Sequence, residues 1–211
     1  KALPPPGNEG EFDLALRDLD LAINQKPDDP EFFFFRGAIK DKGKKDFDGA
    51  VEDYKEAIRL DPADLSGISI KGLMALGGVY VAKDLFKEAA FVYARLVGIA
   101  PRNPSAHNNL GYVRFRLGRY EEAEKDLTRA IELKTDYGKA YVNRGHVRQE
   151  LGWLGLAAQD YHQGGKRVGG GVEATTSLDN SAVASSEAGK LVQYIPSVAS
   201  YEAGGGGESC N

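Results

Sequence analysis

The sequence predicts an all-α solenoid, in which antiparallel helix pairs stack side by side. Three glycines recur at equal intervals, at Gly77, Gly111 and Gly145. Three alanines keep the same spacing, at Ala89, Ala123 and Ala157. A fixed period of about 34 residues is typical of repeat arrays, in which each unit buries its apolar side only against its neighbours.

The repeated residues are those that a close-packed helix pair needs. Glycine in the first helix and alanine in the second let the two helix axes approach each other. Larger side chains stand three residues before each alanine and four residues after it, on the same side of the helix. These side chains are Phe86, Tyr120 and Leu154 before the alanine, and Tyr93, Leu127 and Tyr161 after it.

The stretch from Asn109 to Ala130 carries the fullest version of the pattern. Its matching positions are Leu110, Gly111, Gly118, Tyr120, Ala123, Leu127 and Ala130. This pattern, repeated at a fixed period along the chain, resembles the tetratricopeptide repeat (TPR) family. The resemblance implies a right-handed superhelix whose first helices line a concave face, and that face holds an extended peptide or a helix of another protein.

Composition excludes several other classes of protein. The chain has 211 residues, of which 42% are hydrophobic and 27% charged, as is usual for soluble proteins. Its net charge of −4 argues against a general nucleic-acid binder. The single cysteine, Cys210, allows no intrachain disulfide, and no apolar run is long enough to cross a bilayer.

The array is expected over residues 11–164, after a flexible lead at residues 1–10. It begins with a second-helix half unit at residues 11–29, and four units follow, at about 30–64, 70–103, 104–137 and 138–164. The first helix of the half unit is missing from this sequence. Either an upstream segment has been removed, or this helix caps the array.

Four consecutive phenylalanines, at positions 32–35, open the first full unit. At about 100° per residue they span about 300° of a helix, so they cannot all face one core. Either residues 13–23 cover most of them, or Phe34 and Phe35 line a binding groove. The turn that follows, at residues 40–46, is one residue longer than in later units.

The next unit contains an insertion. The interval from Pro62 to Pro101 is five positions longer than the period, so we expect an extra turn at residues 64–69 and a helix over 70–83. Gly77 and Gly78 weaken that helix by about 1 kcal/mol each. Close packing, or a ligand lying against the backbone, would explain their presence.

The last unit departs from the pattern. Arg144 stands where a leucine usually precedes the glycine, which suggests a half-covered end unit whose Trp153, Leu154 and Leu156 pack on something that follows. Residues 165–211 have a Gly- and Ser-rich linker composition. Within them, the apolar stretch 191–201 is either a short motif that docks on a partner or on the open end, or part of a featureless tail.

No catalytic constellation is found in the sequence. His107, His146 and His162 stand beside no second ligand at metal spacing, and no phosphate-binding loop occurs. We therefore expect no enzyme activity, no cofactor, no metal and no small-molecule substrate.

The family resemblance places a partner-binding groove along the first helices. Its expected lining is Phe34, Phe35, Ala38, Met74, Gly78, Asn108, Asn109, Tyr112, Arg116, Lys139, Asn143 and His146. The N-terminal half of this set is apolar and the C-terminal half is polar and basic. A ligand with an apolar segment and an acidic or amide-rich end would suit it.

The expected function is a non-catalytic scaffold or assembly factor that binds a peptide segment or helix of a partner protein. The alternative is a structural subunit of a large complex, anchored by its convex face and C-terminal tail. An RNA-binding helical repeat ranks third. We expect an intracellular location, in a chloroplast or mitochondrion if the N-terminus has been processed and in the cytoplasm otherwise.

One ligand of the family can be tested on the sequence. Members that hold the acidic C-terminal tail of heat-shock chaperones use Lys, Asn and Arg side chains to clamp two carboxylates. Asn109 and Lys139 match part of that set. Met74, Gly78 and Asn143 stand where the other donors are needed, so this ligand is not expected.

Overall fold

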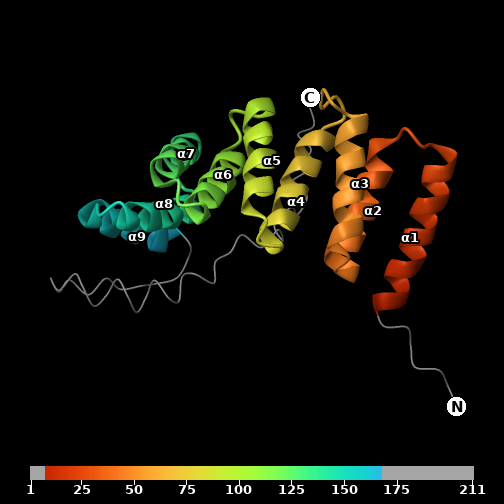
Figure 1. Ribbon diagram of the computed structural model, residues 1–211, viewed down its shortest axis with the longest axis horizontal. Coiled ribbons are helices and arrows are strands. Elements are labelled where there is room, and N and C mark those ends of the chain that lie inside the picture. The colour runs from red at the N-terminus through yellow and green to blue at the C-terminus, as the bar shows by residue number, and fades with distance from the viewer. Residues whose placement is uncertain (1–7, 168–211) are drawn as a thin grey trace, which may run out of the picture. The chain divides into compact units, whose positions relative to one another are not determined.

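The computed structural model describes residues 8–167, which form nine α-helices and one π-helix, with no strand among them (Figure 1). The elements are α1 (Asn8–Gln25), α2 (Pro30–Ala38), η1 (Ile39–Lys44), α3 (Phe47–Leu60), α4 (Ile68–Ala82), α5 (Phe86–Ile99), α6 (Pro104–Arg116), α7 (Tyr120–Leu133), α8 (Gly138–Glu150) and α9 (Leu154–Arg167). Each helix packs on the next one along the chain, which confirms the all-α solenoid. The apolar stretch at residues 191–201 lies outside the described residues.

The two helices of each pair meet at the predicted small residues. A β-carbon added at Gly77 would lie 2.5 Å from the Tyr93 ring, and one added at Gly145 would lie 2.7 Å from the Tyr161 ring. Ala123 in α7 is completely buried. These contacts confirm the register of the helix pairs, and they explain Gly77 by close packing against a neighbouring side chain.

Side chains at the helix starts define several boundaries. Asp29 caps α2 by accepting a hydrogen bond from the Glu31 amide, and Asn103 caps α6 in the same way through Ser105 and Ala106. Pro30 and Pro104 follow these caps directly, where a missing N–H leaves no gap in the hydrogen bonding. Proline thus stands at the first position of both helices.

The extra residue of the first full unit is absorbed inside the helix. Residues 39–44, part of which was expected to form the turn, continue α2 as the π-helix η1. The helix ends at Lys44, and Lys45, which caps it, has a left-handed backbone with φ of 58°. A π-helix accommodates one additional residue without changing the helices on either side, so the insertion does not lengthen the turn.

The five-residue insertion before α4 is organised around Asp61. The Asp61 carboxylate accepts hydrogen bonds from the Leu65 amide (2.8 Å), the Ser66 hydroxyl (2.7 Å) and the Ile68 amide (3.2 Å). Burial alone would raise the pKa of Asp61, but hydrogen bonds from the Ser66 hydroxyl and from the amides of Leu65, Ser66 and Ser69 together outweigh burial and lower it. Asp61 thus caps α4, which begins at Ile68, two residues before the expected start.

The apolar core is unevenly distributed along the array. One large cluster includes Tyr54, Leu73 and Leu96 and reaches from Phe34 in α2 to Val113 in α6. Two small clusters follow, one around Leu127 and one around Ala130. Helix α4 lies within the large cluster and is buried on most sides, which is why its sequence shows little amphipathic pattern.

Candidate protein-binding surfaces

The residues predicted to line the groove lie on the first helices α2, α4, α6 and α8, and they differ in exposure. Phe35 is 49% exposed, and Arg116 is also exposed. Met74 and Asn108 are buried, at 8% and 1% exposure. The others are half-buried, namely Phe34, Ala38, Gly78, Asn109, Tyr112, Lys139, Asn143 and His146.

Some of these predicted residues join neighbouring first helices. The Asn109 amide nitrogen in α6 lies 3.2 Å from the Met74 sulfur in α4 and donates to it. The Asn143 amide nitrogen in α8 donates to Asn108 Oδ1 in α6 at 2.9 Å. The structure thus brings these four residues together as bridges between units, and the buried Met74 and Asn108 have little surface left for a ligand.

Phe33, Phe34 and Phe35, within the run of phenylalanines at positions 32–35, have different surroundings. The Phe34 ring packs 5.8 Å from the Tyr54 ring and belongs to the large core cluster. The Arg36 guanidinium lies 5.4 Å from the centroid of the Phe33 ring. Phe35 packs edge-on against Phe34 while half of its own surface stays open.

Arg116 and His146 are held by aromatic neighbours. The Arg116 guanidinium lies 4.1 Å from the Phe86 ring centroid, and its Nη1 donates to the Tyr112 hydroxyl at 3.0 Å. The His146 ring lies edge-on to Tyr161, whose hydroxyl oxygen is 3.0 Å from Nδ1. Burial lowers the pKa of His146 and favours a neutral imidazole.

On another side, the array presents what we call second-helix surfaces. Each is formed by two successive second helices and the first helix between them. At the first of them, Arg36 of α2 reaches Asp20 of α1 at 2.7 Å and Asp53 of α3 at 2.6 Å. Lys40 adds a further ion pair to Asp53 at 2.8 Å. This network ties α1, α2 and α3 together.

The last second-helix surface, over α8, carries a similar network. Arg144 binds both carboxylate oxygens of Asp160 in α9, at 2.7 and 2.9 Å. Arg148 connects Asp160 with Glu124 of α7, at 2.9 Å each. Arg144 itself is not left half-covered, because its side chain is only 12% exposed and Asp160 neutralises its charge.

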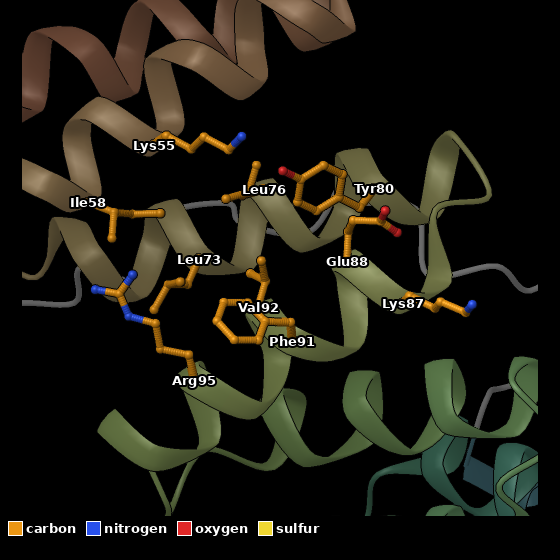
Figure 2. Close-up of a pocket in the computed structure, with 10 residues that line it drawn as sticks. All are labelled: Lys55, Ile58, Leu73, Leu76, Tyr80, Lys87, Glu88, Phe91, Val92 and Arg95. Carbon is orange, nitrogen blue, oxygen red and sulfur yellow. The ribbon is translucent and has the colours of Figure 1, made fainter.

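The surface over α4, between α3 and α5, is open instead. It contains a pocket of about 480 Å³ (Figure 2). The apolar and aromatic lining consists of Ile58, Leu73, Leu76, Tyr80, Phe91 and Val92. The charged residues are Lys55, Lys87, Glu88 and Arg95. Within residues 8–167, Lys55, Lys87 and Arg95 form no ion pair, so the pocket has unneutralised cations at its edge.

This pocket is not among the binding surfaces that the sequence predicts. The signal was present, because Val92 stands at the repeat position that holds Asp53, Asp126 and Asp160 in the other units. Comparing units for charge, and not only for the residues that make the fold, would have found it.

The end of the array keeps exposed apolar side chains. Trp153 is 45% exposed, Leu154 60% and Leu156 43%. Within residues 8–167 no three His, Cys, Asp or Glu side chains gather as metal ligands would. No helix in the same part of the chain is long and apolar enough to cross a membrane.

Two segments of the chain match models of known families. Tetratricopeptide repeat models match residues 31–64 and 104–137. Tetratricopeptide repeat protein 16 of Macaca fascicularis is 27% identical over 155 residues, which is 74% of this chain and 15% of that protein. RNA polymerase II-associated protein 3 of Xenopus tropicalis is 32% identical over 130 residues, 57% of this chain and 20% of that protein. The chain thus spans a fifth or less of these relatives.

Solved structures share the fold. A crystal structure of MamA superposes with a TM-score of 0.66 at 20% identity, and the match covers 76% of this chain and 91% of that one. YrrB, described as a TPR protein with an unusual peptide-binding site, gives 0.59 at 22% identity over 71% of this chain and 74% of its own.

Proposed function

Because the chain is a tetratricopeptide-repeat protein, we propose that it acts as a non-catalytic scaffold that binds a peptide segment or helix of another protein along its first helices. The partner would lie across α2, α4, α6 and α8. Binding of this kind needs a preorganised surface, so that the ordering cost falls mainly on the peptide. The hydrogen bond between Asn143 and Asn108 joins α8 to α6 and helps to preorganise this surface.

The observation that carries the proposal is the change in character along the first helices. Phe35 offers an exposed aromatic ring on α2. Arg116 on α6 is exposed, and Lys139 on α8 is half-buried. A ligand with an apolar anchor near α2 and carboxylates near α6 and α8 would match this order.

Exposed positions give a sharper test than the buried ones. The full chain carrying Phe35→Ser and Lys139→Glu should lose partners that co-purify with the wild-type chain from a native extract. Circular dichroism should show an unchanged fold, because both side chains keep contact with water. The matched control is Leu65→Ser, which removes an apolar side chain that is 91% exposed and lies outside the first helices and the pocket residues. Partners that bind the double variant as well as they bind the wild-type chain and this control would refute binding along the first helices.

A second candidate is a structural subunit of a larger complex. It is favoured by the exposed Trp153, Leu154 and Leu156 at the start of α9. Such a role predicts that the isolated chain self-associates through these side chains, because exposed apolar patches favour association with other protein surfaces. A monodisperse monomer in light scattering, unchanged by Trp153→Ser, would count against this candidate.

A further inference from the structure

We propose that the pocket between α3 and α5 is a second docking site, which binds an acidic segment of a partner protein through an inserted apolar side chain. The site is distinct from the first-helix surface. Leu73, Leu76 and Tyr80 lie on one side of α4, whereas Met74 and Gly78 lie roughly 150° further around it, at about 100° per residue. A partner on one surface therefore leaves the other free.

The pocket arises from residues at three positions of the repeat unit. Three positions of the unit decide what a second-helix surface looks like. The residue before the first-helix glycine is Arg36, Leu76, Leu110 or Arg144. The residue three after that glycine is Lys40, Tyr80, Arg114 or Arg148. The residue three after the second-helix alanine is Asp53, Val92, Asp126 or Asp160.

In three of these four units the aspartate is paired with a cation. Asp53 binds Arg36 and Lys40, Asp126 binds Arg114, and Asp160 binds Arg144 and Arg148. The unit of α4 and α5 has Leu76, Tyr80 and Val92 at these positions, and all three line the pocket. The pocket therefore exists because this unit has apolar side chains where the others have an ion-pair network.

An aromatic ring is exposed at the pocket. Phe91 is 75% exposed at the pocket, beside the buried Val92 (Figure 2). In the other full units the equivalent residues are the charged or polar Glu52, Lys125 and Gln159. An exposed phenylalanine over an apolar depression is what an inserted aliphatic or aromatic side chain would cover, because apolar surface is then removed from water.

Charge identifies the occupant. Lys55, Lys87 and Arg95 are exposed and unpaired within the described part of the chain, and Glu88 is the only acid among the pocket residues. Carboxylates flanking the inserted side chain would complement these cations. The chain's own apolar stretch at residues 191–198 contains no Asp or Glu. A symmetric contact with a second copy would place the same cations opposite each other. An acidic partner segment is therefore the better match.

Selection from a displayed library of random short peptides on the full chain tests this directly. We expect the enriched peptides to combine one large apolar residue with neighbouring Asp or Glu. They should lose affinity by about tenfold or more, equal to about 1.4 kcal/mol, when the chain carries Leu76→Arg and Val92→Asp. This double variant rebuilds the ion pair of the other units and fills the pocket.

A second variant is needed in case the first one does not fold. Lys55→Glu, Lys87→Glu and Arg95→Glu together change only exposed side chains, and they should abolish binding of the acidic peptides. The matched control is Lys26→Glu, Arg102→Glu and Lys125→Glu, which changes the net charge equally at exposed sites away from the pocket residues. Binding should survive in this control.

Several results would overturn the proposal. Enriched peptides without acidic residues, or none enriched at all, would do so, as would equal binding to the wild-type chain and both pocket variants. A photo-crosslinker placed at Phe91 separates the rival occupants. Crosslinks to residues 191–198 of the same chain would assign the pocket to that stretch. Crosslinks to a second copy would assign it to a dimer.

Discussion

The surface over α4 and the surface over α8 occupy the same place in the repeat but have opposite chemistry. Over α8, Arg144 is fixed between Asp160 and Thr128. Over α4, the equivalent of Arg144 is Leu76 and the equivalent of Asp160 is Val92. The helix pairs beneath are alike, since both depend on a glycine against a tyrosine ring. The difference shows that the residues that make the fold and those that shape its outer surface vary independently.

Removing Asp160 tests the closed surface and should have the largest effect. Asp160→Ala leaves Arg144 and Arg148 largely buried without their shared carboxylate, so unfolding free energy should fall by about 3 kcal/mol. Denaturant titration followed by circular dichroism would measure it. Glu132→Ala is the control, because its ion pair with Arg129 is exposed and should contribute less than about 0.5 kcal/mol. Equal losses in the two variants would contradict a structural role for the network.

Glycine replacements test whether the two regions really share one packing scheme. Gly77→Ala and Gly145→Ala should each cost about 1–3 kcal/mol, because the added methyl groups meet Tyr93 and Tyr161. Thermal melts of both variants would compare the two regions directly. Gly98→Ala, where an added β-carbon would meet no atom of another element within 4 Å, should be neutral or stabilising by up to about 1 kcal/mol. A large cost in one pair only would show that the packing is not shared.

Acid stability should separate the unit that carries the insertion from the others. The lowered pKa of Asp61 means that its contribution is complete above the ordinary carboxyl range near pH 4, and is lost as pH falls through the folded-state pKa. Asp61→Asn should cost about 1–2 kcal/mol at neutral pH by weakening the cap of α4. Unfolding titrations at several pH values should show this cost shrinking in acid. A cost that does not depend on pH would exclude the carboxylate as its source.

The smallest effect is expected at the open pocket itself. Phe91→Ser should change the unfolding free energy by less than about 0.5 kcal/mol, because the ring is 75% exposed. Calorimetry of the full chain would check this. A loss comparable to that of Asp160→Ala would mean that Phe91 holds the fold together, and that the pocket is part of the core.

The sequence predicted the helix pairs well because their contacts are local and recur. Gly111 and Leu127, whose close approach sets one pair, lie on consecutive helices, and the same two positions meet in other units. A deviation from the pattern was harder to interpret. At position 144 the pattern predicts a leucine, whereas the role of Arg144 depends on Asp160 in the next helix. The π-helix at residues 39–44 was also missed, because an inserted residue can extend a turn or widen a helix.

The candidate binding surfaces were less predictable than the fold. The first-helix residues followed from the family resemblance, but no pattern in the sequence indicated that Asn108 would be buried against Asn143. Whether that surface binds a peptide stays a prediction. The pocket depends on what is missing at Leu76 and Val92, and a search for recurring residues does not register a missing charge.

The uneven core has a consequence for how the array comes apart. The large cluster reaches from α2 to α6, whereas α8 contributes only to the two small clusters, and α9, which belongs to none of the three, is joined to α8 through the ion pairs of Asp160. In a linear array each unit is held only by its neighbours, so opening can begin at an end without breaking the middle. Amide protons of α4 and α5 should therefore exchange with solvent most slowly, while those of α9 exchange through fraying. The open pocket thus lies on the segment that stays folded longest.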